Sequence, residues 1–140
     1  MVRTLVDTCV LSELYRPDCH PGVRAAFDEL KSDEIFLSVL TLGELTKGVA
    51  LLPPGRRKSN LGAWVSRMES NFSDHLLSID GEIARLWGEL TARAKATGFQ
   101  VAPTDGLIAA TALHHGLLVM TRNTRDFAAT GVLLTDPWQN

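Results

Sequence analysis

Short apolar runs and longer amphipathic segments take turns along the chain. The runs lack the apolar–polar alternation of a half-exposed strand, which favours strands buried on both faces of a parallel sheet. We expect strands at residues 5–6, 35–38, 75–79, 117–121 and 132–134. Strands that alternate with helices in this way predict an α/β fold, in which a central, mainly parallel sheet of four to five strands carries helices on both faces.

Between these runs, apolar residues recur every three or four positions and predict helices. One helix begins directly after Asp7, and others are expected at residues 23–31, 40–51 and 61–72, between Asp80 and Gly98, and at residues 103–115. A Pro-Pro-Gly sequence at residues 53–55 ends the third helix, because proline cannot continue it. No repeat, low-complexity tract or linker divides the chain, so we expect a single domain over residues 1–140.

Four acidic residues share one kind of position, just after a predicted strand or at the start of a predicted helix. They are Asp7, Glu44, Asp105 and Asp126, the last in a loop after the fourth strand. In a parallel sheet such positions meet at the carboxyl-end edge, where α/β proteins bind their ligands. Asp7 ends a buried strand, and a buried acid is costly to leave unpaired, so we expect a cationic partner there.

Carboxylates that converge repel one another, and a divalent cation relieves this repulsion. Oxygen ligands without neighbouring His or Cys favour Mg²⁺ or Mn²⁺ over zinc. Each acid also has a structural interpretation. Asp105 would complement a helix dipole, Thr41 and Glu44 match a capping box, and Asp126 would form a turn. The agreement of the four positions favours a shared metal site over these separate structural roles.

Composition narrows the possible functions. The chain is 45% hydrophobic and 21% charged, with a net charge of −2, so nucleic acid would have to bind through a local basic patch or a metal ion. Cys9 and Cys19 form no CxxC pair and are too few for a disulfide framework, which favours a reducing cytoplasm. We expect neither a signal peptide nor a membrane-spanning segment.

Four segments together resemble the motifs of the PIN domain family. They are Leu5-Val6-Asp7-Thr8 with Val10-Leu11-Ser12-Glu13, residues 38–45 with Gly48, residues 105–112, and Thr121-Arg122-Asn123 with Asp126-Phe127. Their order and spacing and the length of the chain fit the family throughout, so the resemblance covers essentially the whole sequence. Within the family the chain looks most like the VapC toxins of bacterial toxin–antitoxin pairs, including its closing Asp136-Pro137-Trp138.

This resemblance implies a metal-dependent endoribonuclease toxin that hydrolyses RNA phosphodiester bonds. Asp7 and Asp105 would be the principal metal ligands, and Glu44 would complete the acidic site. The fourth catalytic position falls on Asp126 or on Asn123. Where the family usually has Asn or Ser, this chain has Cys9, so a polar contact beside the site is expected to be missing. The resemblance further implies a homodimer, held inactive by a small antitoxin whose tail covers the site.

Substrate phosphate would be bound by polar residues near the acids. Arg122 and Arg125 precede Asp126 in the same loop, and guanidinium groups bind phosphate through paired hydrogen bonds. Arg125 could equally pair with an acid. Thr8 and Thr121 lie beside the acids and could bind phosphate or carboxylates, although threonines at strand ends are more often structural.

Three rival functions remain open. An aspartyl phosphatase would use Asp7 as its nucleophile and needs an acid two residues later, where Cys9 stands. A receiver-like switch needs an adjacent acidic pair at the end of the first strand, which the sequence lacks. A non-catalytic PIN module that binds RNA or protein with a degenerate metal site would suit Cys9 and Asn123, but the four acids favour the nuclease.

Overall fold

The strands of the structure, a computed structural model that describes residues 2–139, form one parallel sheet. Within those residues the sheet has five strands in the order β3-β2-β1-β4-β5, and each neighbouring pair is parallel. The strands are β1 (Thr4–Val6), β2 (Ile35–Ser38), β3 (Leu76–Leu77), β4 (Leu118–Met120) and β5 (Leu134–Thr135). The predicted parallel α/β fold is confirmed, with β1 as its central strand.

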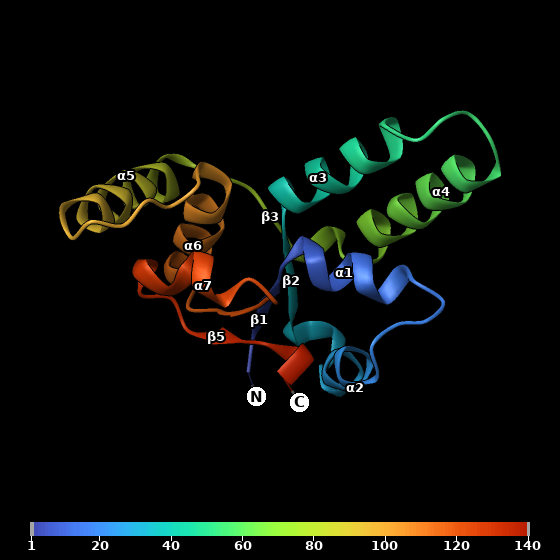
Figure 1. Ribbon diagram of the computed structural model, residues 1–140, viewed down its shortest axis with the longest axis horizontal. Coiled ribbons are helices and arrows are strands. Elements are labelled where there is room, and N and C mark those ends of the chain that lie inside the picture. The colour runs from blue at the N-terminus through green and yellow to red at the C-terminus, as the bar shows by residue number, and fades with distance from the viewer. Residues whose placement is uncertain (1, 140) are drawn as a thin grey trace.

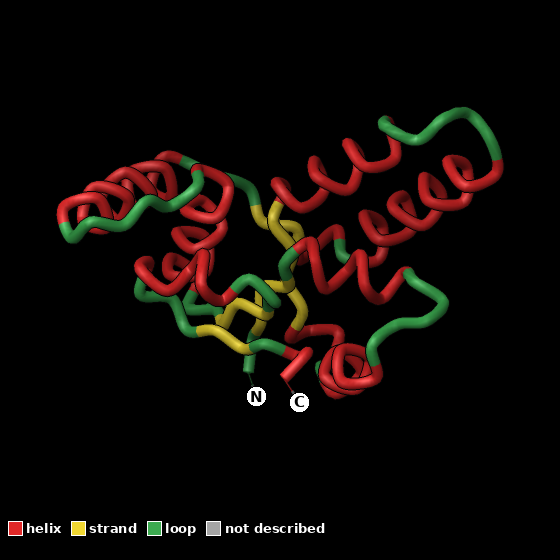
Figure 2. The backbone as a smooth tube through the Cα atoms, in the orientation of Figure 1, coloured by secondary structure: helices red, strands yellow, loops and turns green. Residues whose placement is uncertain are grey.

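Two groups of helices cover the sheet, α1 to α4 on one side and α5 to α7 on the other (Figure 1). The strands lie between these groups, as Figure 2 shows. The α-helices of residues 2–139 are α1 (Thr8–Tyr15), α2 (Pro21–Glu29), α3 (Val39–Ala50), α4 (Arg56–Asn71), α5 (Gly81–Ala96), α6 (Pro103–His115) and α7 (Thr124–Phe127). Short 3₁₀ turns at Ser32–Glu34, Ser73–His75, Ala128–Thr130 and Pro137–Gln139 complete the elements.

The central strand divides the core because successive side chains of a strand point to opposite faces. Val6 packs with apolar residues of α1 to α4, including Val10 and Leu45. Leu5 packs with α6 and α7 instead, through residues such as Ile108 and Phe127. Both strand residues are 1% exposed, as expected for a strand covered on both faces.

Several elements differ from their predicted form, and α4 begins at Arg56 and not at residue 61. β3 is much shorter than residues 75–79, because His75 belongs to a 3₁₀ turn, where its ring stacks on Phe36 at 4.3 Å between centroids. β5 lies one or two residues later than predicted. The segment after β4 is the short helix α7 and not a loop, because Phe127 is fully buried and anchors it.

The topology brings the ends of separate segments to one edge of the sheet. α1 and α3 begin directly after β1 and β2, and α7 follows β4 after a short turn. α6 precedes β4, so it too must begin at the carboxyl-end edge in order to return the chain to the other end of a parallel strand. None of the helices described in residues 2–139 combines the length and the apolar character needed to cross a bilayer.

Candidate active site

Asp7 is the buried centre of this edge. It is the N-cap of α1 and only 6% exposed. Its Oδ1 accepts a hydrogen bond from the Thr8 N–H at 2.9 Å, and its Oδ2 accepts one from the Thr121 hydroxyl at 2.8 Å. Among the described residues, no Lys or Arg side chain forms an ion pair with Asp7. The expected cationic partner is therefore not a side chain, and neutral donors hold the carboxylate instead.

Thr121 acts on the site through Asp7. It follows β4, which is the neighbour of β1 in the sheet, so its fully buried hydroxyl lies against the Asp7 carboxylate. The sequence contains a signal for this contact, a polar residue directly after a buried strand. That signal alone could not distinguish a structural threonine from one that positions an acid.

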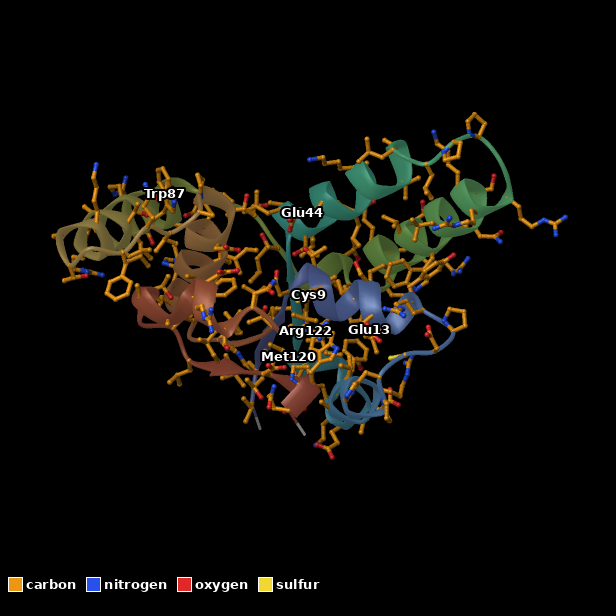
Figure 3. All side chains as sticks on the ribbon, viewed as in Figure 1. Cys9, Glu13, Glu44, Trp87, Met120 and Arg122 are labelled. Atoms are coloured by element: carbon orange, nitrogen blue, oxygen red, sulfur yellow. The ribbon has the colours of Figure 1, made fainter. Side chains whose placement is uncertain are left out.

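Cys9, labelled on α1 in Figure 3, lies against the same carboxylate oxygen of Asp7 that Thr121 binds. Its Sγ lies 3.8 Å from Asp7 Oδ2 and 3.5 Å from Thr121 Oγ1, and it accepts the Arg122 N–H at 3.5 Å. Burial raises the pKa of the Cys9 thiol, and the Asp7 carboxylate raises it further. The neutral thiol therefore stays in contact with the acid, and the polar contact that the substitution was expected to remove is weakened but present.

Glu44 projects from α3 toward the first turn of α1. The Thr8 hydroxyl donates to Glu44 Oε1 at 2.7 Å and lies 3.1 Å from the Thr41 hydroxyl. The capping-box interpretation of Glu44 is wrong, because α3 begins earlier than that motif requires. Its N-cap is Ser38, whose Oγ accepts the Leu40 N–H at 3.0 Å.

Asp105 has a raised pKa, to which three neighbouring acids contribute. It lies in the first turn of α6, whose N-cap Ala102 contributes no side-chain cap. Burial and, to a smaller extent, the charges of Asp7, Asp126 and Glu44 together raise the pKa of Asp105 to about 6. A favourable helix dipole would lower this pKa, so desolvation and crowding outweigh the dipole at this position.

The residues after β4 contribute one acid and two exposed arginines. Asp126 lies on α7, and its charge acts on Asp105. Asn123 is the N-cap of α7, and its backbone N–H bonds to Thr121 Oγ1 at 3.0 Å. Arg122 stacks over the Trp138 ring at 5.1 Å, whereas Arg125 forms no ion pair with any described residue. The suggested pairing of Arg125 with an acid is absent.

The donor set suits a hard divalent cation, although the carboxylates stand apart. Within residues 2–139, no three His, Cys, Asp or Glu side chains converge closely enough to hold one metal ion. The charges of Asp7, Asp126 and Glu44 nevertheless act on Asp105, and their repulsion adds to burial in raising its pKa. A divalent cation would relieve that repulsion, and carboxylate oxygens are the ligands that Mg²⁺ and Mn²⁺ prefer.

Fold and edge together define an α/β protein with an oxygen-rich acidic site at the carboxyl ends of its strands. The chain belongs to the PIN domain family, whose sequence model matches residues 4–133. Toxin FitB of Neisseria gonorrhoeae is 38% identical over 140 residues, covering 97% of this chain and 99% of that protein. VapC ribonuclease Y4jK of Sinorhizobium fredii is 34% identical over 139 residues, covering 96% and 97%.

Solved structures extend the likeness to three dimensions. The crystal structure of FitAcB from Neisseria gonorrhoeae superposes with a TM-score of 0.93 at 37% identity, covering 98% of this chain and 99% of that one. A toxin–antitoxin complex from Klebsiella pneumoniae superposes with a TM-score of 0.73 at 25% identity, covering 96% and 97%. The resemblance found in the sequence motifs is therefore confirmed over nearly the whole chain.

Proposed function

We propose that this protein is a metal-dependent endoribonuclease, the toxin of a toxin–antitoxin pair. The observation that supports the proposal is the acidic edge of the sheet, where Asp7 caps α1, Glu44 accepts a hydrogen bond from Thr8, and the charges of Asp7, Glu44 and Asp126 act on Asp105. Support comes from a relative named as a ribonuclease and another named as a toxin, each matched over nearly the whole chain.

Asp7 and Asp105 would hold the metal ion, Mg²⁺ or Mn²⁺, and Glu44 would complete its ligands, with Asp126 supporting a second ion or orienting water. A bound dication lowers the pKa of water and neutralises the phosphate that water attacks. The protein supplies the geometry for this chemistry. Asp7 is held from two sides by Thr8 N–H and the Thr121 hydroxyl, so its carboxylate needs little further ordering when the site forms.

Substrate phosphate would be oriented by Arg122, Arg125 and Thr8. Both arginines are exposed at the edge that carries the acids, and neither is paired with a carboxylate of residues 2–139. Arg122 is held against Trp138, which limits the side-chain entropy lost when it binds an anion. The Thr8 hydroxyl would first have to release Glu44.

The biological assembly is a homodimer of single-domain chains, residues 1–140, that acts on RNA in the cytoplasm and is inhibited by a cognate antitoxin. A structural relative that is itself a toxin–antitoxin complex supports the antitoxin. The alternative function is a non-catalytic PIN module. It is favoured by one observation, that no three His, Cys, Asp or Glu side chains of the described residues converge on a common point. Metal-dependent cleavage separates the two.

The deciding experiment incubates partner-free protein with an RNA mixture, with and without Mg²⁺ or Mn²⁺, and sequences the new RNA ends. We expect cleavage that EDTA abolishes and that Asp7→Asn removes while the far-ultraviolet circular dichroism spectrum stays unchanged. Glu69→Gln is the matched control, because it also removes one negative charge but at an exposed residue of α4, and it should cleave normally. A fully active Asp7→Asn protein would refute the assignment of the site.

A further inference from the structure

A cavity of about 580 Å³ opens directly beside two of the acids. Asp105 and Asp126 form one part of its wall, and the opposite part comes from the second half of α5 and the loop that returns from α5 to α6. This volume lies within the range of about 300–1,000 Å³ that is usual for ligand pockets. The PIN motifs include none of the residues on the α5 and loop side.

That opposite wall presents an aromatic ring and a cation. Phe99 is a large apolar residue of the loop, yet its side chain is 58% exposed. Lys95, on the last turns of α5, is exposed and forms no ion pair with a carboxylate among residues 2–139. Single-stranded nucleic acid is bound by this combination, because bases stack on aromatic rings and phosphates attract cations.

The helix that carries Lys95, α5, packs closely against α6. An added Cβ at Gly106 would lie 2.9 Å from the indole of Trp87, so only glycine permits the observed approach of α5. Trp87 Nε1 and Thr91 Oγ1 are buried there without a hydrogen-bond partner among the described residues, a cost that close packing imposes. The cavity is therefore bordered by two closely packed helices and the neighbouring acids.

We infer that this cavity is a nucleotide subsite in which Phe99 stacks on the base next to the scissile phosphate and Lys95 binds a flanking phosphate. The inference rests on the proposed ribonuclease function and deepens it. Charge supports this occupant, because the acidic wall suits a phosphate only together with metal, whereas the flanking phosphate meets an unpaired cation. Gln100, also in the wall, offers both a donor and an acceptor to the edge of the base.

The test measures steady-state cleavage of a labelled single-stranded RNA of mixed sequence by the full-length, partner-free protein. Phe99→Leu keeps apolar volume but removes the π face, so KM should rise about 5- to 150-fold, the range expected for one stacked base, with kcat nearly unchanged. Phe99→Tyr keeps the aromatic ring, so its KM should equal that of the wild-type protein. Lys95→Gln should raise KM and reduce the slope of log KM against log salt by about 0.7, as for one phosphate contact.

Two controls test whether the change in KM arises from base stacking in this cavity. Leu133→Ala, at an apolar residue that is 74% exposed elsewhere on the surface, should leave KM unchanged. Nucleoside 5′-monophosphates should inhibit wild-type cleavage more strongly than ribose 5-phosphate, and Phe99→Leu should abolish that difference.

Three results would overturn the inference. If wild type cleaves RNA and Phe99→Leu has the same KM, the subsite is refuted while the ribonuclease function stands. If Phe99→Leu changes the mass in solution measured by light scattering, Phe99 belongs to an interface between copies of the chain. If wild type cleaves no RNA with any divalent metal, the function itself fails, and the subsite fails with it.

Discussion

At the scale of single residues, Asp7 and Asp105 differ in burial, in hydrogen bonding and in the charges around them. Asp7 is almost fully buried, yet two short hydrogen bonds compensate its carboxylate. Asp105 is more exposed but sits among other acids, and the pKa of its carboxyl rises to about 6. Burial and the neighbouring acids therefore make the ionised form of Asp105 unfavourable in the metal-free fold.

Asp105→Asn should make the metal-free protein more stable at neutral and alkaline pH. The folded-state pKa of about 6 lies above the ordinary value of 3.8, so the stability gained from protonation is complete below about 3.8 and is lost as pH rises through 6. At about pH 8 the variant should gain on the order of 1 kcal/mol in unfolding free energy, after allowance for solvent screening. Urea denaturation in EDTA measures this gain.

The pH dependence is what identifies the cause of that gain. Near pH 4.5 the wild-type carboxyl is protonated in the folded state, so the advantage of Asn should be clearly smaller than at pH 8, and it should vanish only below about 3.8. Glu69→Gln, on the exposed face of α4, should show no such change with pH. An advantage of equal size at both pH values would mean that packing and not charge explains the effect. The stabilised variant should also lack ribonuclease activity.

At the scale of secondary structure elements, the contact between α5 and α6 positions half of the site. α6 begins with Asp105 in its first turn, and Gly106 is the next residue. The buried alanines of α6 include Ala109 and Ala110, both fully buried, and their small side chains allow close packing. Any shift of α5 away from α6 would move Asp105 relative to Asp7, which is fixed on the central strand.

Gly106→Ala should disturb that contact. The new Cβ would lie 2.9 Å from two atoms of the Trp87 ring, and a rigid, partly buried indole moves aside less readily than a flexible side chain, so we expect a loss of about 1–3 kcal/mol in unfolding free energy. Because Asp105 would move with α6, RNA cleavage should fall as well. Chemical denaturation and cleavage assays measure the two effects.

Gly88→Ala provides the matched control within the same helix pair. A Cβ at Gly88 meets no atom within 4 Å, and alanine favours a helix interior by roughly 0.5–1 kcal/mol over glycine. This variant should therefore be somewhat more stable than wild type and fully active. If both alanine variants behaved alike, the close approach of Trp87 to Gly106 would have no energetic significance.

At the scale of the whole molecule, the site joins the two groups of helices. Asp7 and Glu44 come from the side formed by α1 to α4, and Asp105 and Asp126 come from α6 and α7 on the other side (Figure 1). A cation that binds acids from both groups would link them across the edge of the sheet. Metal binding should therefore stabilise the entire fold and not only one helix.

Mg²⁺ or Mn²⁺ should raise the melting temperature of the wild-type protein, and EDTA should reverse the effect. A ligand at one hundred times its dissociation constant adds about 2.7 kcal/mol to the unfolding free energy, and thermal denaturation over a metal titration measures it. The response should weaken as pH falls through about 6, where Asp105 takes up its proton. Asp7→Asn should abolish it, and Glu69→Gln should retain it. An unchanged response in Asp7→Asn would place the metal elsewhere.

Sequence by itself determined the architecture and the identity of the acids. The apolar runs and helical periodicity indicate which faces are buried, and the carboxyl ends of parallel strands must share an edge, so the positions of Asp7, Glu44 and Asp105 along the chain predict that they lie at one edge of the sheet. The same reasoning misplaced Asp126 in a loop, because the burial of Phe127 that forms α7 depends on distant residues.

Only the tertiary structure decided how the acids are held and what lies beside them. The hydroxyl of Thr121 reaches Asp7 across 114 positions of the chain, and no local pattern encodes such a pairing. The pKa of Asp105 depends on the charges and burial that surround it. The cavity lined by Phe99 and Lys95 forms only where a loop, two helices and α7 meet. Contacts and electrostatic fields of this kind depend on distances in space, which packing sets and periodicity does not record.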